Sequence, residues 1–171
     1  EKEFIDVQLA RRQMGYGRGG RMKIEKDQVE IWSGIRLGKT IASPIGLIVK
    51  NKDWENWKDK MAIEEREKMP KKVTLPRPGH ADLAGIEKFD FDDIRNVLER
   101  SSARETTMRV AIASVCRKLL KDIGINVASR VTQIHNITDE SVVPDDMTAG
   151  ELNEIVDKSP LRCLDLSLIH I

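Results

Sequence analysis

A chain of 171 residues is long enough for one domain with its own hydrophobic core. Hydrophobic residues make up 40% and charged residues 33%, which is typical of a globular protein in water, and no apolar run is long enough to cross a bilayer. Aromatic residues reach only 4%, so we expect an aliphatic core, and a net charge of +1 excludes nucleic-acid binding through bulk charge.

The N-terminal part predicts one helix and a small sheet. Residues 3–12 carry apolar side chains on one side and charges on the other, which predicts an amphipathic helix that ends before the glycine-rich run 15–20. Residues 21–25 and 28–33 alternate in polarity around a Lys-Asp pair, which predicts a β-hairpin. Residues 44–50 form an apolar run that predicts a buried strand.

The middle of the chain predicts short helices joined by an extended segment. Residues 53–69 are dense in charge, with apolar residues at near-helical spacing, and predict one or two short helices that cover the sheet. Residues 71–78 are expected to be extended, because their two prolines exclude a helix. Residues 91–100 predict a helix with Asp90 as its N-cap and Asp93 at the third position.

The best-defined helix is predicted to begin at Ser102. Ser102 and Glu105 have the spacing of a capping box, in which each side chain bonds a backbone N–H of the other residue. Apolar residues then recur at three- and four-residue steps and predict one buried stripe, and Gly124 ends the helix. Cys116 lies in the same run and is expected to be a small buried residue. The stripe consists of Met108, Ile112, Val115 and Leu119.

The C-terminal part predicts one strand and one further helix. Residues 125–137 alternate in polarity as a long strand that contains His135. Thr148 and Glu151 have the spacing of a second capping box, which opens a helix to about Asp157. The two cysteines lack the spacing of a zinc site or a disulfide framework, so we expect no metal.

A basic, glycine-rich segment lies at residues 11–23. It holds five cations and no acid, a local charge of +5, which favours a small anionic ligand or an acidic surface. Glycines let a backbone approach a ligand closely, but the spacing is not that of a dinucleotide-binding fingerprint. A flexible basic loop explains the same residues, as does an RNA-binding module, although the scarcity of aromatic residues argues against RNA. The cations are Arg11, Arg12, Arg18, Arg21 and Lys23.

Two further segments have the residue types needed for chemistry. His80 lies in a tight Pro-Gly turn, and histidine suits proton transfer near neutral pH. Arg100, Ser101 and Ser102 lie where a helix is predicted to open, and the free N–H groups and dipole of a helix N-terminus favour an anion. A hydrogen-bonded structural histidine and a capped helix with solvated arginines explain the same residues without a ligand.

Four blocks combine these features: RRQMGYGRGGRM at residues 11–22, SGIRLGKT followed by SPI at 33–45, RPGHAD at 77–82 and RSSARE at 100–105. Together they resemble signature blocks of the chorismate synthase family, in the family's order, and the resemblance runs over about residues 5–164. It implies conversion of 5-enolpyruvylshikimate-3-phosphate to chorismate by anti 1,4-elimination of phosphate, a step of the shikimate pathway of aromatic amino acid biosynthesis. The reaction of this lyase requires reduced FMN.

The resemblance also implies roles for individual residues. His80 matches a catalytic histidine proposed to protonate the reduced flavin. The implied FMN contacts are Arg100, Ser101 and Ser102. The implied contacts to the anionic substrate are Arg12, Arg18, Arg77 and Arg104, and the first two are alternatively contacts to a pyridine nucleotide such as NADP. Whether NAD(P)H reduces the flavin on the enzyme itself is left open.

Weaker candidates for phosphate contacts are Arg36, Lys39 and Arg95. Asp82 and Glu105 are expected to orient neighbours and cap a helix rather than to take part in the chemistry.

By the same resemblance we expect an α+β fold in which antiparallel sheets sandwich helices, incomplete in this chain. The family forms homotetramers, and we expect a cytoplasmic enzyme with no nucleic-acid or membrane partner. The chain lacks the family's N-terminal Gly-Glu-Ser-His-Gly block and its C-terminal half. We therefore expect residues 1–165 to be the N-terminal part of a single domain, residues 166–171 to be a doubtful tail, and the chain alone to have little or no activity.

Overall fold

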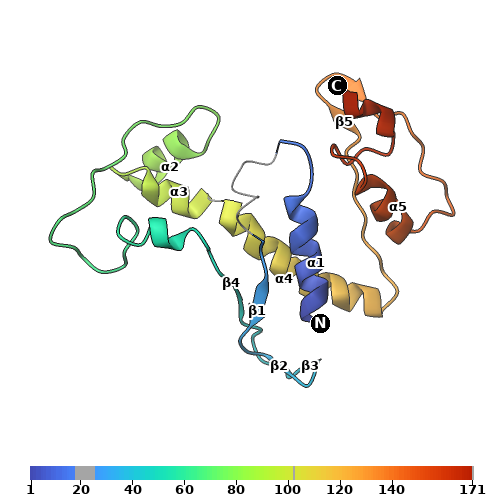
Figure 1. Cartoon of the computed structure of the whole chain (residues 1–171), viewed down its shortest axis with the longest axis horizontal. Helices are drawn as coiled ribbons and strands as arrows, with labels where there is room; N and C mark the ends of the chain where they lie inside the picture. The colour runs from blue at the N-terminus through green and yellow to red at the C-terminus, as the bar shows by residue number, and fades with distance from the viewer. Residues whose placement is uncertain (18–25, 102, 171) are drawn as a thin grey trace. The chain divides into compact units, whose positions relative to one another are not determined.

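The structure is a computed structural model that describes residues 1–17, 26–101 and 103–170 (Figure 1). The chain divides into two compact units, one formed by residues 1–50 and 110–171 and the other by residues 51–109. Each unit has buried residues of its own.

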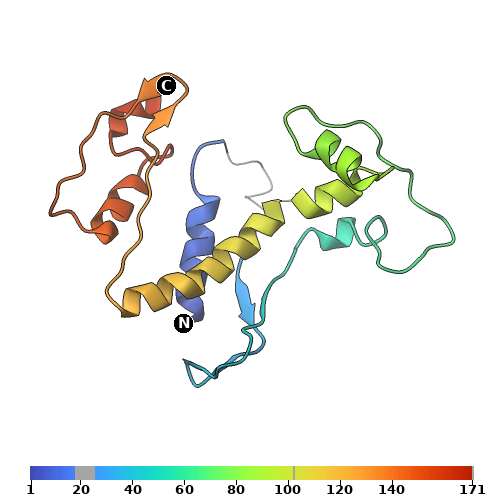
Figure 2. The same ribbon diagram turned by 180° about the vertical axis from the view of Figure 1, so that it is seen from behind.

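The first unit begins with α1 (Lys2–Gln13), which confirms the predicted N-terminal helix. Its buried side chains, Ile5 and Leu9, are four residues apart and therefore lie on one face. They form the core cluster with Val29 of the sheet and Ala111 of α4. Accordingly, α1 runs across α4 (Figure 2).

The main sheet of this unit consists of β1 (Val29–Ile31) and β4 (Leu47–Val49), which pair antiparallel. Both strands were predicted, but β4 is half-buried rather than fully buried. The described partner of β1 is β4; the other arm of the predicted hairpin, residues 21–25, lies outside the described residues. Asp6 of α1 accepts the backbone N–H of Val29 at 2.8 Å, which ties the start of the sheet to the helix.

A second hairpin joins the two strands of the main sheet. It consists of β2 (Ile35–Arg36) and β3 (Lys39–Thr40). Both turn residues, Leu37 and Gly38, have positive φ angles of 49° and 76°, as a type I′ turn requires. At the base of the hairpin, a Cβ on Gly34 would lie 2.6 Å from the carbonyl oxygen of Pro44, so the two chain segments meet where only glycine fits.

The second unit contains a short 3₁₀ helix, η2 (Trp54–Asn56), and two α-helices, α2 (Asp82–Phe89) and α3 (Arg95–Ser101). The helices predicted for residues 53–69 reduce to η2. Large apolar residues of that segment, such as Ile63, are exposed, so no buried face stabilises a longer helix.

The helix predicted for residues 91–100 begins later, at Arg95. Asp90 does not open it, because Asp90 adopts the left-handed conformation (φ 54°, ψ 46°) that closes α2. Asp93 makes the cap instead: its carboxylate accepts the backbone N–H of Arg95 at 3.1 Å. Gly85 of α2 lies against α3, where an added Cβ would meet a methyl carbon of Val97 at 2.4 Å.

α4 (Ala103–Asp122) confirms the predicted long helix, but its buried face differs from the prediction. The buried residues are Thr107, Ala111 and Ser114, whereas Ile112 and Leu119 are exposed. Ala111 lies in the core cluster with Ile5 and Leu9 of α1, and Val115, which the predicted stripe includes, packs against this cluster. The hydroxyl of Ser114 donates to the carbonyl of Val110 at 2.6 Å. The expectation that Cys116 is buried is also wrong, since it is exposed. Ser102, the predicted cap, lies outside the described residues.

The long strand predicted for residues 125–137 is wrong. The segment contains only β5 (Gln133–Ile134), paired with β6 (Ile137–Thr138) across a turn in which His135 has a φ of 55°. Earlier in the segment the carbonyl of Val127 is bonded by the side chains of Arg117 and Asn153 rather than by a neighbouring strand.

The C-terminal helix α5 (Ala149–Val156) forms as predicted. Thr148 and Glu151 make both hydrogen bonds of the capping box. A last 3₁₀ helix, η3, spans Leu166–His170. The segment before it is fixed by the buried carboxylate of Asp139, which accepts the backbone N–H groups of Leu164 and Asp165 at 2.7 and 3.2 Å.

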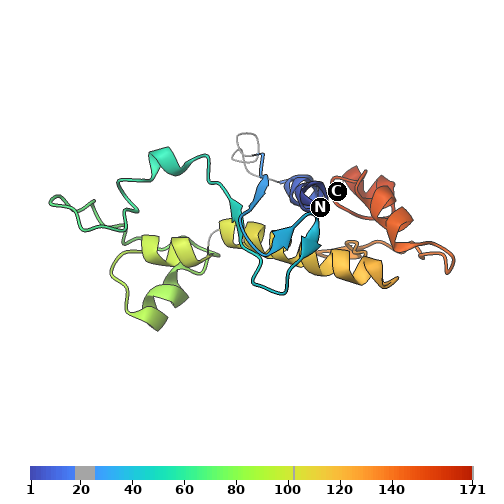
Figure 3. The same cartoon turned by 90° about the horizontal axis from the view of Figure 1, so that it is seen from below.

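Helices and small antiparallel sheets along one chain make the fold α+β (Figure 3). Within the described parts of the chain, no helix is both long and apolar enough to cross a membrane.

Candidate functional site

His80 is the fourth residue of a tight turn at the start of α2. Its backbone N–H donates to the carbonyl of Arg77 at 3.4 Å, with Pro78 second in the turn and Gly79 third at a φ of 74°. Proline at the second position and a positive φ at the third are the features of a type II turn. The turn leaves the imidazole of His80 exposed, so a ligand can reach it within hydrogen-bond distance.

The carboxylate of Asp82 holds Arg77, the first residue of this turn. Its side chain is only 1% exposed, and its carboxylate accepts the Nε and Nη2 groups of Arg77 at 2.9 and 3.0 Å and the backbone N–H of Arg77 at 2.8 Å. The side-chain hydrogen bonds from Arg77, followed by the backbone one, lower the pKa of Asp82 to about 2. Asp82 is therefore an anion at neutral pH that orients Arg77 and closes the turn that carries His80.

Arg100 and Ser101 end α3 instead of opening a helix. The guanidinium carbon of Arg100 lies 4.5 Å from the centre of the Phe89 ring, a cation–π contact, and Phe89 stacks on Phe91 with ring centres 5.6 Å apart. No carboxylate pairs with Arg100 among the described residues, and the hydroxyl-bearing side chain of Ser101 is exposed. Both side chains are therefore accessible to an anion.

The two parts of the candidate site lie at opposite ends of α2. The turn with His80 precedes the first residue of that helix, whereas Arg100 packs on Phe89, its last residue. Ser102 and the side chain of Arg104 lie outside the described residues.

Arg12 belongs to the first unit and is largely buried. Its guanidinium lies 3.6 Å from the carboxylate of Asp27, with the two side chains 12% and 2% exposed. Arg18, the other arginine predicted from this segment, lies outside the described residues.

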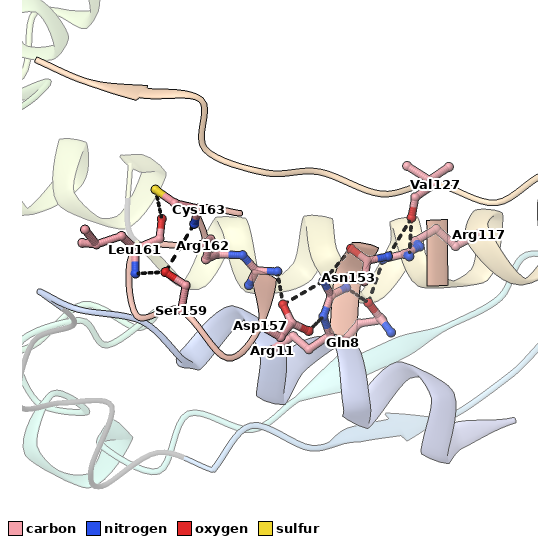
Figure 4. A network of polar contacts seen from close by, with 10 residues as sticks. All are labelled: Gln8, Arg11, Arg117, Val127, Asn153, Asp157, Ser159, Leu161, Arg162 and Cys163. Atoms are coloured by element: carbon pink, nitrogen blue, oxygen red, sulfur yellow. Dashed lines mark hydrogen bonds and ion pairs between the residues drawn. The ribbon is translucent and has the colours of Figure 1, made fainter. Parts of the chain in front are cut away.

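Arg11 joins α1 to α5, as Figure 4 shows. Its guanidinium donates to the carboxylate of Asp157 at 2.6 and 3.1 Å and to the side-chain oxygen of Asn153 at 3.0 Å. Arg162 contacts the same carboxylate. Carboxylates from other parts of the chain thus offset part of the charge at residues 11–23, which weakens the RNA-binding interpretation.

The weaker candidates separate into two groups. Arg36 and Lys39 are exposed on the β2–β3 hairpin. Arg95 is buried and bonds the carboxylate of Asp93 at 2.7 Å, so it holds the start of α3 in place.

Metal ligands do not cluster in the described part of the chain: no group of three His, Cys, Asp or Glu residues could hold an ion there. Burial raises the pKa of the Cys163 thiol, with the negative charge of Asp139 acting in the same direction. Cys163 is therefore a packing residue.

Comparison with known proteins gives the context for this site. The sequence matches the family model of chorismate synthase over residues 1–169. The chain belongs to the chorismate synthase family. The chorismate synthase of Enterococcus faecalis is 56% identical over 169 residues, which cover 97% of this chain and 43% of that protein. That of Chlorobium phaeovibrioides is 60% identical over 139 residues, or 81% of this chain and 35% of that protein.

A crystal structure of a chorismate synthase superposes on this chain with a TM-score of 0.71 at 33% sequence identity. The superposition covers 99% of this chain and 42% of that one. The chain thus spans less than half the length of the chorismate synthases that it matches.

Sequence reasoning missed two features of this chorismate synthase segment. The helix α2 was not predicted, because its eight residues are too few for a clear apolar period. Asp82 was expected to orient its neighbours, but its partner Arg77 was not predicted. Opposite charges five residues apart around a Pro-Gly pair are a signal that could have indicated it.

Proposed function

We propose that this chain forms part of a chorismate synthase, a lyase that converts 5-enolpyruvylshikimate-3-phosphate to chorismate by anti 1,4-elimination of phosphate. The observation that carries the proposal is the match to the family over residues 1–169. The small anionic substrate suits a chain whose exposed cations, including Arg77 and Arg100, are presented from a turn and from a helix end.

For the complete enzyme we propose the family's sandwich of antiparallel sheets around helices, a homotetramer and a cytoplasmic location. Residues 1–165 would form the N-terminal part of a single domain, with residues 166–171 as a tail.

The described residues fit a phosphorylated flavin. Arg100 is held in place by Phe89 without a carboxylate partner among the described residues, so its charge is available to a phosphate. Ser101 and Ser102 would add hydroxyl donors. Reduced FMN, when bound, supplies an electron transiently and takes up the proton that the substrate loses.

Arg77 would contact the substrate through the N–H groups that Asp82 does not use. Because Asp82 offsets its charge, Arg77 serves better to orient a carboxylate or phosphate than to attract it over a distance. Arg12, Arg18 and Arg104 complete the proposed substrate contacts, and the first two are alternatively contacts to NADP. Preorganised cations of this kind stabilise the charge that develops on a leaving phosphate.

His80 is the proposed proton donor to the reduced flavin. Its backbone is fixed by the turn and its imidazole is exposed, so the side chain can exchange protons with a bound ligand.

The test is an anaerobic assay of chorismate formation with reduced FMN. This chain would be assayed alone and as a chimera in which it replaces the matching region of the Enterococcus faecalis enzyme, which is 56% identical. We expect turnover in the chimera and little or none in the chain alone. A folded chimera that binds FMN and forms no chorismate would contradict the proposal. Replacing reduced FMN by FMN with NADPH in the same assay tests for intrinsic flavin reduction.

A further inference from the structure

Two cations from different helices contact the ring of Phe89, the last residue of α2. The ammonium nitrogen of Lys88 lies 5.5 Å from the centre of this ring, and the guanidinium carbon of Arg100, on α3, lies 4.5 Å from it. The two positive charges are therefore within about 10 Å of each other, roughly one Debye length in dilute salt, so salt does not fully screen them from one another. Both residues are exposed, so a solute can reach them.

Neither cation is neutralised by a carboxylate among the described residues. The ring of Phe89 attracts both of them but carries no net charge, so their positive charge persists. Other cations of this unit do have an acidic partner. Such ion pairs join Lys72 to Asp92, Arg77 to Asp82 and Arg95 to Asp93.

The backbone that carries the two cations is held by close packing. Phe89 stacks on Phe91 with ring centres 5.6 Å apart. The two helices meet so closely that a Cβ on Gly85 of α2 would lie 2.4 Å from a methyl carbon of Val97 on α3. Lys88 and Arg100 therefore extend from supports with a fixed separation, and their charges stay together although they repel each other.

We propose that Lys88 and Arg100 together bind one phosphate monoester. A phosphate monoester carries a charge of about −1.5 to −2 at neutral pH and therefore matches two cations, whereas a carboxylate neutralises only one. The guanidinium offers a planar pair of donors and the ammonium a point charge, so each binds different oxygens of the same phosphate.

The inference rests on the proposed function, which brings two phosphate monoesters to the enzyme, FMN and 5-enolpyruvylshikimate-3-phosphate. The flavin is the expected source of the phosphate, because Arg100 is the proposed FMN contact. Lys88 then adds a second charge to that contact from the neighbouring helix.

Fluorescence titration of the chimera with FMN, and with riboflavin, which lacks the phosphate, tests the inference. We expect Lys88→Gln to weaken FMN binding by about fivefold and to leave riboflavin binding unchanged, because only the phosphate meets the ammonium group. Lys60→Gln is the matched control. Lys60 lies 5.2 Å from the ring centre of Trp57 in the same unit, without a second cation on that ring among the described residues, and its loss should leave FMN binding unchanged. Circular dichroism checks that both variants are folded.

The outcomes separate the two sources of phosphate from each other and from the proposed function. A loss of FMN affinity alone assigns the pair to the flavin phosphate, and a raised KM for the phosphorylated substrate alone assigns it to the substrate phosphate. If a folded Lys88→Gln chimera binds FMN and forms chorismate with unchanged affinity and KM, the inference is overturned and the proposed function stands. Equal losses of FMN and riboflavin affinity would overturn it too, since Lys88 would then act on something other than the phosphate. A chimera that fails to bind FMN contradicts the proposed function and this inference with it.

Discussion

The guanidinium of Arg77 and the carboxylate of Asp82 are joined by side-chain hydrogen bonds of 2.9 and 3.0 Å, and the same carboxylate holds the backbone N–H of Arg77 at 2.8 Å. One buried anion thus holds both the side chain and the backbone of Arg77, the first residue of the turn that carries His80.

Acid should weaken the interaction between Asp82 and Arg77 and lower the stability of the chain. The pKa of Asp82 is lowered to about 2 in the folded chain, below about 3.9 for an unfolded aspartate. The folded state therefore binds this proton less readily, so the stability contributed by Asp82 is present above about pH 4 and is lost as the pH falls towards 2. Thermal unfolding of the wild type and of Asp82→Asn should differ at neutral pH and converge in acid. Glu87→Gln, a neutralised exposed carboxylate on the same helix, is the control; a pH-independent difference for Asp82→Asn would contradict the assignment.

The contact between α2 and α3 should tolerate no extra methyl group. Gly85→Ala would bring its Cβ to 2.4 Å from a methyl carbon of Val97, and we expect it to destabilise the chain by about 1–3 kcal/mol. Val97→Ala makes room, so Gly85→Ala should cost less in that background. Urea unfolding of the two single variants and the double variant measures this coupling. Equal costs of Gly85→Ala in both backgrounds would show that the two residues do not meet.

The carboxylate shared by Arg11 and Arg162 should matter more than a surface carboxylate. Asp157→Asn leaves two largely buried guanidinium groups without their anion, and we expect a loss of about 2 kcal/mol in unfolding free energy. Asp122→Asn breaks a more exposed pair with Lys118 and should cost about 0.5 kcal/mol or less. Chemical denaturation compares them, and similar losses for both variants would refute the joining role of Asp157.

Flavin affinity should depend on Arg100. In the chimera with the Enterococcus faecalis enzyme, Arg100→Gln removes a charge-assisted hydrogen bond to a phosphate and should weaken FMN binding by about tenfold. Arg109→Gln removes an exposed arginine that already pairs with Glu105 and serves as the control. Fluorescence titration of FMN measures both; equal affinities for the two variants would remove Arg100 from the flavin site.

The sequence predicted those elements that depend on interactions between residues close together in the chain. The α5 capping box formed because Thr148 and Glu151 satisfy each other within one turn. The buried face of α4 could not be predicted, because it depends on which side α1 approaches. Likewise, the sequence of residues 125–137 alternates like a strand, yet the carbonyl of Val127 is bonded by the side chains of Arg117, in the preceding helix, and Asn153, in the following one.

Within the candidate site, too, only the part with locally determined geometry could be predicted. The Pro-Gly turn around His80 was readable from residue types alone, since proline and glycine impose its geometry. The position of Arg100 was not, because the end of α3 and the ring of Phe89 determine it.

We propose that His80 is the proton donor of the chorismate synthase site. The direct measurement is the rate of anaerobic chorismate formation in the chimera, with His80→Asn compared with His135→Asn, a matched change in an exposed histidine of another turn. We expect His80→Asn to lower the turnover rate by about a hundredfold or more without loss of folding or FMN binding, and His135→Asn to have no effect. Full activity in a folded, FMN-binding His80→Asn chimera would contradict this role of His80.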